Sequence, residues 1–299
     1  MDIIELKGVK KGFGPLSVLR SLDMKISSGG IYGFLGENAS GKTTTIRLIM
    51  GLLEPEAGEV KVLGENPSDY SIATKARISY VPEEQVLPEW MRLKDLSEFH
   101  GAHFPRWKQE EFERIRNLFE IPSNATIASL SKGSKRKAAL ALALSTGADL
   151  YVLDEPASGL DPNARMDFMD TLMGLFQEEE KTVLFSTHLL SDLEKSADFV
   201  LMLYDGKIVL NEALDNLREK MVRIHVSGNL NVETIKNSFN VLDTDEAIAN
   251  GDFVIIDDGK SLVDRFIEEQ KGLARKMPFS LDDLFRRITK KEKSKDEII

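Results

Sequence analysis

The sequence predicts an α/β protein with a parallel sheet, a small antiparallel β layer, an inserted helical subdomain and a small α+β C-terminal domain. Leu150–Leu153 and Thr182–Ser186 are too apolar to have a solvent face, as is typical of strands inside a parallel sheet. A third apolar segment, Ile31–Leu35, is followed by a glycine-rich loop and a helical pattern. A strand, a loop and a helix in this order indicate an α/β unit.

The antiparallel layer is predicted from short strands on either side of that unit. Ile3–Val9 and Val18–Ile26 are separated by a turn that contains glycine and proline, and Gly58–Gly64 supplies a further strand. Arg77–Pro82 is predicted to be a buried strand that ends at its proline.

The helical subdomain is predicted at about residues 88–147. Apolar residues recur at spacings of three and four in Leu93–Phe99 and Glu110–Phe119. We expect this subdomain to lie within a first domain of residues 1–220, and residues 221–299 to form an accessory domain. In the latter, Val222–Val226 and Phe253–Asp257 resemble strands and Leu262–Ile267 resembles a helix.

Composition excludes several classes of protein. The chain has 299 residues, of which 42% are hydrophobic and 29% charged, as expected for a globular protein. It has no cysteine, so disulfides, thiolate metal sites and cysteine catalysis are excluded, and its net charge of -10 argues against general nucleic-acid binding. No apolar run approaches the roughly 18 residues that cross a bilayer, and the acidic start lacks the basic region of a signal peptide, so we expect a cytoplasmic protein.

The most informative motif is G-x-x-x-x-G-K-[ST] at Gly36–Thr43, directly after the Ile31–Leu35 strand. Its glycines let backbone N–H groups converge on phosphate oxygens, Lys42 can reach the β- and γ-phosphates, and Thr43 can offer its hydroxyl to Mg²⁺. The motif predicts a P-loop nucleoside triphosphatase core. The residues predicted to bind the nucleotide here are Gly36, Glu37, Asn38, Ala39, Ser40, Gly41, Lys42, Thr43 and Thr44.

A second motif, Asp154-Glu155, follows the Leu150–Leu153 strand. An aspartate at the carboxyl end of a buried strand beside a phosphate loop can hold Mg²⁺ or one of its waters. Glu155 can then orient and polarise the attacking water. An isolated acidic pair before a proline turn would have no such role, but the phosphate loop favours the catalytic interpretation.

A third motif, Leu130–Ser134, opens a predicted helix over residues 135–144. Lys132, Lys135, Arg136 and Lys137 crowd its first turns, where the helix dipole favours acids. A solvated basic face is one explanation. The glycine-serine start, with free N–H groups, favours a bound phosphate instead.

The order of these motifs resembles the ATP-binding cassette family, the nucleotide-binding subunits of ABC transporters, over residues 1 to about 220. The matching segments are Gly36–Thr43 (Walker A), Leu130–Ser134 (the LSGGQ signature), Val152–Pro156 (Walker B), Ser158–Asp161 (the D-loop) and Ser186–His188 (the switch histidine).

The resemblance implies roles for further residues. His188 would contact the γ-phosphate of ATP and help to hold Glu155 and the water. Ser131 and Gly133 of the signature and Asp161 of the D-loop would contact nucleotide. Phe13 falls where the family places an aromatic ring against adenine, although burial against the small sheet would equally explain it.

Two positions depart from the family pattern. The signature has Lys132 and Ser134 where glycine and glutamine are most common, whereas the phosphate-facing Ser131 and Gly133 are kept. The loop after Val81 has Glu83 where the family has a glutamine that senses Mg²⁺. The Glu83 carboxylate could ligate Mg²⁺, or it could be a solvated loop residue.

The resemblance also implies partners. Two cassettes face each other head to tail around two ATP molecules, so this chain needs a second cassette, most simply a copy of itself. Closure would act on transmembrane permease subunits from a separate polypeptide, which places the protein on the inner face of the cell membrane. The segments Phe104–Trp107 and Phe279–Phe285 resemble those of antibiotic-efflux and resistance exporters, which implies export.

The alternative is a soluble ABC protein that acts on nucleic acid or ribosomes. Translation-factor members carry two cassettes in one chain, and repair members insert a long coiled coil between Walker A and Walker B. This chain has one set of motifs, and the interval between Walker A and Walker B is about 110 residues without sustained heptads. No nucleic-acid partner is therefore expected.

Overall fold

The computed structural model describes residues 2–84, 86–160, 162–177, 181–227, 231–243, 245–257, 262–270, 272–278 and 280–296. It separates into two compact units, residues 1–211 and 212–299.

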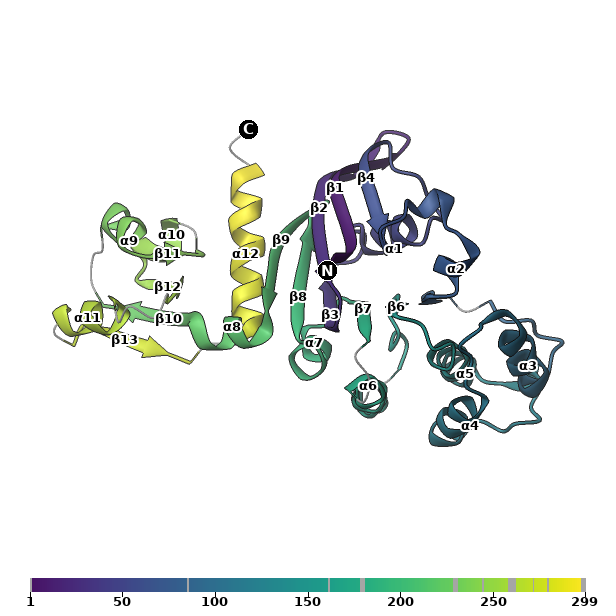
Figure 1. The fold of residues 1–299 in the computed structure, drawn as a ribbon. Helices are drawn as coiled ribbons and strands as arrows, with labels where there is room; N and C mark the ends of the chain where they lie inside the picture. The colour runs from purple at the N-terminus through teal and green to yellow at the C-terminus, as the bar shows by residue number, and fades with distance from the viewer. Residues whose placement is uncertain are drawn as a thin grey trace. The chain divides into compact units, whose positions relative to one another are not determined.

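The first unit is built on a sheet with strand order β5-β6-β7-β3-β8-β9 (Figure 1). The pairs from β5 to β8 are parallel, which confirms the predicted parallel sheet. Every residue of β6 and β7 is buried, as their apolar sequences require. The strands are β3 (Gly30–Leu35), β5 (Ile78–Val81), β6 (Leu150–Leu153), β7 (Thr182–Thr187), β8 (Phe199–Tyr204) and β9 (Lys207–Ala213).

The predicted antiparallel layer is confirmed in the strand order β2-β1-β4. Leu22 of this layer shares one hydrophobic core with Phe34 of the parallel sheet and with Ile46 of helix α1, and each is fully buried. Burial of such a side chain contributes about 1.5–3 kcal/mol, so the shared core fixes the helix that follows the phosphate loop. The elements are β1 (Asp2–Phe13), β2 (Leu16–Ser27), β4 (Ala57–Val62) and α1 (Lys42–Ile49).

The inserted helices contact one another and form a group at one side of the parallel sheet (Figure 1). Phe112 and Leu140 are fully buried within this unit, which explains the apolar spacing of three and four. They are α3 (Leu93–His103), α4 (Gln109–Leu118) and α5 (Lys132–Leu144), and the other helices of the unit are α2 (Ile72–Lys75), α6 (Pro162–Gln177) and α7 (Leu190–Ser196).

The second unit is an α+β fold, as predicted, with an antiparallel sheet of order β11-β12-β10-β13. Ile224, Ile248 and Phe253 are fully buried in its core. Ser280 caps the last helix, because its Oγ accepts a hydrogen bond of 3.2 Å from Asp283 N. Phe279 lies outside the described residues. The elements are β10 (Met221–Val226), β11 (Asn240–Val241), β12 (Asp252–Ile256), β13 (Ala274–Met277), α8 (Leu214–Lys220), α9 (Val232–Ser238), α10 (Asp245–Ala249), α11 (Leu262–Glu269) and α12 (Leu281–Asp296).

A buried ion pair ties α12 to the sheet of the second unit. Arg287 Nη1 lies 2.7 Å from Asp243 Oδ1, and Arg287 Nη2 lies 3.1 Å from Asp252 Oδ2. The Asp243 side chain is only 4% exposed, and burial raises the pKa of this carboxyl although Arg287 and the Val254 amide oppose the shift. Asp243 therefore depends on Arg287 to remain charged in the interior.

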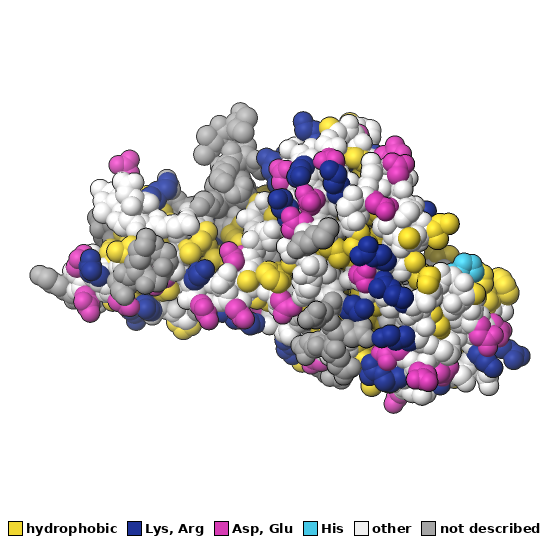
Figure 2. All heavy atoms as spheres, viewed as in Figure 1, with side chains coloured by type: hydrophobic (Ala, Val, Ile, Leu, Met, Phe, Trp, Pro, Cys, Tyr) yellow, Lys and Arg dark blue, Asp and Glu magenta, His cyan; other side chains and the backbone are white. Residues whose placement is uncertain are grey.

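The surface carries acidic and basic side chains interspersed with one another on the face that Figure 2 shows. Within the described part of the chain, no helix combines the length and the apolar character that a membrane span requires.

Replacing Arg287 with methionine is expected to destabilise the second unit by about 3–5 kcal/mol, because it leaves Asp243 buried without its cation. Since the folded state raises the pKa of Asp243, the loss is largest at neutral pH and shrinks as the pH falls and the carboxyl is protonated. The loss of stability of the second unit is measured by hydrogen exchange at the β10 and β12 amides as a function of pH.

The control is Arg286→Met at the neighbouring position, where an exposed pair with Asp282 is worth about 0.3–0.5 kcal/mol. Equal protection of the sheet in both variants would contradict the account.

Candidate functional site

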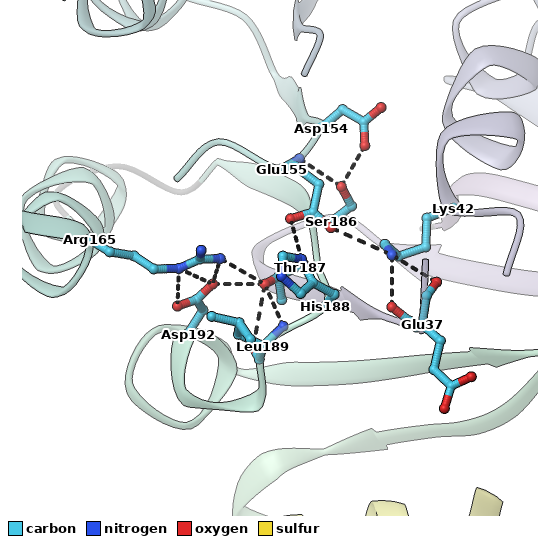
Figure 3. Close-up of polar contacts among 11 residues, drawn as sticks. Glu37, Lys42, Asp154, Glu155, Arg165, Ser186, Thr187, His188, Leu189 and Asp192 are labelled. Carbon is cyan, nitrogen blue, oxygen red and sulfur yellow. Dashed lines mark hydrogen bonds and ion pairs between the residues drawn. The ribbon is translucent and has the colours of Figure 1, made fainter. Parts of the chain in front are cut away.

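The carboxyl ends of three neighbouring parallel strands bring the predicted motifs together at one edge of the sheet. β3 leads into the Gly36 loop, β6 into Asp154 and Glu155, and β7 into His188. Gly36 N donates to Thr187 O over 3.4 Å, which links two of these strand ends directly. Figure 3 shows the side chains that meet there.

The phosphate loop requires glycine at two positions because of close packing. A Cβ on Gly36 would lie 2.5 Å from Ser40 Oγ and 2.9 Å from the backbone oxygen of Leu203, which cannot turn away as a side chain can. Gly41 has a φ of 109°, and a Cβ there would lie 2.8 Å from Leu19 Cδ2. The chain then enters α1 at Lys42, and the first N–H groups of a helix have no partner within it. Such a helix start attracts phosphate.

Lys42, the first residue of α1, is buried, and three contacts hold its side chain against the loop. Its Nζ donates to Gly36 O over 2.7 Å and to Glu37 O over 3.2 Å, and it lies 3.5 Å from Glu155 Oε1. The ammonium group is therefore shared between the loop and the acidic side chain at the end of β6.

Glu155 is held in an unusual conformation by its neighbours. Its φ of 46° is in the left-handed region, which costs a non-glycine residue roughly 1–2 kcal/mol. Glu155 N donates to Ser186 Oγ over 2.8 Å, and Ser186 Oγ donates to Asp154 Oδ1 over 2.6 Å. His188 Nδ1 lies 2.9 Å from Glu155 Oε2, and because a carboxylate oxygen accepts, the ring donates through Nδ1. These bonds fix the Glu155 carboxylate beside Lys42.

Asp154 retains a buried oxygen that the protein does not satisfy. The residue is 1% exposed, and its Oδ2, like Ser40 Oγ, has no hydrogen-bond partner among the described residues. Burial, with the nearby Asp154 charge, raises the pKa of Tyr80 to about 12. A free carboxylate oxygen at this place is suited to a water of hydrated Mg²⁺.

A cavity of about 560 Å³ lies in front of these groups, a size within the range of small-molecule sites. Its wall includes an apolar side formed by Phe13, which is 47% exposed, and by Leu16 and Val18. Phe13 is thus not buried against the small sheet. The remaining lining residues are Asn38, Ala39, Gly41, Lys42, Thr43, Thr44, Glu83, Glu155, Ser158 and His188.

The donor set fits Mg²⁺ brought by a phosphate ligand. Thr43 and Glu83 line the cavity and offer oxygens. Asp154, the neighbour of Glu155 in the chain, adds Oδ2, which is unpartnered within the described chain. Among the described residues there is no cluster of three or more acidic or histidine side chains that could hold a metal alone. Mg²⁺ in phosphate sites takes one or two carboxylates, waters and substrate oxygens, so such a cluster is not needed.

Comparison with known proteins decides the family. The family model described as "ABC transporter" matches residues 19–158. The Nod factor export ATP-binding protein I of Rhizobium sp. is 34% identical over 209 residues, which cover 68% of each chain.

The chain belongs to the ABC transporter family.

Other relatives match nearly the whole chain. The Nod factor export ATP-binding protein I of Burkholderia lata is 29% identical over 97% of each chain. The ABC transporter ATP-binding protein YtrB of Bacillus subtilis is 26% identical and covers 95% of this chain and 97% of its own. A solved structure of an ATP binding subunit of an ABC transporter superposes with a TM-score of 0.64 at 28% identity, over 72% of this chain and 92% of that one. The chain is therefore an ATP-binding subunit of an ABC transporter, and cassettes of this family are ATPases.

The ABC signature lies apart from the cavity within the same unit. Ser131 caps α5 by accepting a hydrogen bond of 3.1 Å from Ser134 N and is exposed, whereas Gly133 is half-buried. Neither residue lines the cavity that holds Lys42. The predicted nucleotide contact of Asp161 falls outside the described residues.

Three basic residues of the signature helix contact other residues of the same chain. Lys135 Nζ lies 2.6 Å from Glu89 Oε1, and Lys137 Nζ lies 6.0 Å from the centre of the Phe119 ring. Arg136 is buried and donates from Nη2 to Glu83 O over 2.9 Å. Because Lys135, Arg136 and Lys137 make these contacts, an anion at the signature would be bound by Lys132 and by the backbone N–H groups at the start of α5.

The hydrogen bond from Arg136 to the Glu83 carbonyl is a contact that the sequence did not reveal. Burial lowers the pKa of its guanidinium, and the Glu83 charge opposes that shift. The bond to the Glu83 carbonyl ties the signature helix to the loop that lines the cavity. The basic run was visible in the sequence, but the identity of its partners depends on packing between elements.

The hydrogen bonds of Ser186 to Asp154 and Glu155 are further contacts that the sequence did not reveal. Ser186 belongs to the switch motif, but nothing in the motif indicates that its hydroxyl bridges Asp154 and Glu155. The sequence likewise gave no signal for Leu16 and Val18 as part of the cavity.

Replacing Ser186 with alanine is expected to lower the free energy of unfolding by about 1–3 kcal/mol, because the buried Glu155 N–H loses its acceptor. We also expect a roughly tenfold lower kcat for ATP hydrolysis, since the Glu155 backbone is then free to leave its strained conformation. Thermal unfolding and steady-state assays measure these effects.

Ser196→Ala is the matched control, because Ser196 is also a buried serine and its Oγ has no partner among the described residues. Removing the Ser196 hydroxyl should change the free energy of unfolding and kcat only slightly. If both variants behaved alike, the bridging role of Ser186 would be rejected.

Proposed function

We propose that this chain binds and hydrolyses MgATP in the cavity lined by Lys42, Glu155 and His188, and that it does so as a dimer of cassettes that drives export through separate membrane subunits. The observation that carries the proposal is the position of the Glu155 carboxylate, 3.5 Å from Lys42 Nζ and 2.9 Å from His188 Nδ1 at the edge of one cavity.

Lys42 changes partners when a triphosphate binds. Its Nζ contacts two loop carbonyls and Glu155, and phosphate oxygens compete for the same ammonium group because they carry more charge. Once Lys42 turns to the β- and γ-phosphates, Glu155 loses its cation. Its carboxylate is then available to accept a hydrogen bond from the attacking water.

Glu155 and His188 act as a positioned pair. Phosphoryl transfer needs little covalent chemistry from the protein, so orientation of the water and neutralisation of charge supply most of the catalysis. Glu155 orients and polarises the water. The His188 ring donates to Glu155 through Nδ1, which leaves its other nitrogen for the γ-phosphate.

The residues that would hold Mg²⁺ are Thr43, Asp154 and Glu83. When bound, Mg²⁺ would neutralise the negative charge that develops on the phosphate oxygens during the transfer. Asp154 Oδ2 is buried and has no partner in the described chain, and Glu83 is held at its carbonyl by Arg136. A carboxylate at the Glu83 position adds a negative charge that a glutamine would not.

Dimerisation completes the site. Ser131 and Gly133 lie at the start of α5 and outside the cavity of their own chain. We infer that ATP bound in that cavity would leave its phosphates open to a second subunit. A second copy related by a two-fold axis would bring its signature to those phosphates, and each subunit would serve the other. Asp161 is proposed to contact the nucleotide at the same interface.

Export is supported by the relatives named for Nod factor export, two of which match as described above. We propose that permease subunits on a separate chain form the pathway, that this chain lies peripherally on the inner face of the cell membrane, and that the domain after residue 220 is an accessory to the cassette of residues 1–220.

Glu155→Gln is expected to reduce steady-state ATP hydrolysis at least about a hundredfold, because the amide cannot accept the proton of the water. The same variant should form an ATP-bound dimer, since closure precedes hydrolysis. Light scattering after gel filtration with MgATP measures the dimer, with phosphate release measured in parallel.

Glu54→Gln is the control, an exposed glutamate outside the cavity lining, and it should hydrolyse ATP as the unchanged chain does. Lys42→Ala should remain monomeric with ATP. Unchanged turnover in Glu155→Gln would reject Glu155 as the catalytic carboxylate.

A polytopic membrane protein is expected to copurify in stoichiometric amount with the tagged chain from detergent-solubilised native membranes. Mass spectrometry of the membrane and soluble fractions, handled in parallel, identifies the partner. Recovery with ribosomes or nucleic acid from the soluble fraction alone would instead favour the soluble ABC alternative.

A further inference from the structure

A buried polar cluster lies directly behind His188 and is not used in the chemistry above. It consists of Arg165 on α6, Thr187 at the end of β7 and Asp192 on α7 (Figure 3). Thr187 is 1% exposed, and the side chains of Arg165 and Asp192 are 10% and 6% exposed. The cluster joins three elements of the first unit at one point.

The cluster is held by a fork of hydrogen bonds. Arg165 Nε donates to Asp192 Oδ1 over 3.0 Å, and Arg165 Nη2 donates to Asp192 Oδ2 over 2.6 Å. This bidentate pair fixes the orientation of the Asp192 carboxylate as well as its charge. Asp192 Oδ2 then accepts a hydrogen bond of 2.7 Å from Thr187 Oγ1.

Thr187 Oγ1 connects Asp192 to the backbone on both sides of His188. Its Oγ1 donates to Asp192 and accepts a hydrogen bond of 3.0 Å from Leu189 N. The residues before and after His188 are therefore tied through one hydroxyl. The His188 side chain itself is 36% exposed and is held to Glu155 by a single hydrogen bond, so its position depends on the backbone around it.

We propose that Thr187, Asp192 and Arg165 are positioning residues that hold His188 against Glu155, so that the switch segment keeps its geometry whether or not a nucleotide is bound. A buried ion pair gives little net stability compared with apolar packing, which favours a positional role. Arg165 extends the constraint to α6, the helix after the Ser158–Leu160 segment, of which Ser158 lines the cavity. The inference rests on the proposed roles of Glu155 and His188.

The test compares Thr187→Val, which keeps the volume and loses the hydroxyl, with Thr187→Ser, which keeps the hydroxyl and loses a methyl. A positioning role predicts that the valine variant loses about tenfold in kcat while the KM for ATP changes less than about twofold. The serine variant should stay near the unchanged chain. A packing role predicts the reverse order.

NMR spectroscopy can report a change in the surroundings of the His188 ring independently of ATP hydrolysis. The chain has four histidines, so ¹⁵N spectra of the imidazoles can be assigned by comparison with His188→Gln. We expect the His188 Nδ1 resonance to shift in Thr187→Val and to stay unchanged in Thr187→Ser. Asp192→Asn should reproduce the valine result, and it replaces that variant if Thr187→Val does not fold.

Thr146→Val is the matched control, because Thr146 is 2% exposed and its Oγ1 makes one internal hydrogen bond to Ala143 O, away from the cavity. It should leave kcat and the His188 resonance unchanged. An unmoved resonance in both Thr187→Val and Asp192→Asn would overturn the inference. If His188→Gln turned over normally while the resonance still moved, the proposed role of His188 would fail and the positional role of the cluster would stand.

Discussion

The parallel pairing of β3, β6 and β7 is the constraint on which the site depends. Because the three strands run in the same direction, their carboxyl ends meet at one edge, where Lys42, Glu155 and His188 approach one another from distant parts of the sequence. Every residue of β6 and β7 and all of β3 after Gly30 are buried, which holds the strand ends in register. Chemistry at this edge follows from the alignment of the strands.

The polar groups at this edge are largely paired with one another before any nucleotide is added. Lys42 is paired with Glu155, Glu155 with His188, and Asp154 with the Ser186 hydroxyl, so most polar groups are satisfied. The exceptions are Asp154 Oδ2 and Ser40 Oγ, which are buried without partners in the described chain. A ligand that supplies both a cation and phosphate oxygens would satisfy these atoms and exchange the partners of Lys42.

Local motifs explain which parts of the site could be predicted from the sequence. The phosphate loop acts through consecutive backbone N–H groups, so its residues are contiguous and its glycines mark it. Asp154 and Glu155 were recognisable because they follow an apolar strand. Contacts made across the fold gave no such signal: Arg165 and Asp192 are 27 positions apart, and Ser186 is 31 from Glu155.

Backbone conformation and burial were also beyond the sequence. Glu155 adopts a positive φ that is uncommon in a glutamate, and its amide donates to Ser186 Oγ in that conformation. For Phe13 the sequence left stacking and burial equally open, and its exposure at the cavity excludes burial against the small sheet. Both outcomes depend on neighbours that only the fold supplies.

The most direct measurement is a crystal structure of the full chain with Mg²⁺ and an ATP analogue whose β,γ-bridge resists hydrolysis. We expect Lys42 Nζ to leave Glu155 for phosphate oxygens and Glu155 to face a water near the γ-phosphate. Asp154 Oδ2 should gain a partner among the waters around the metal. Phosphates bound with the Lys42–Glu155 pair intact and Asp154 Oδ2 still unpartnered would contradict this expectation.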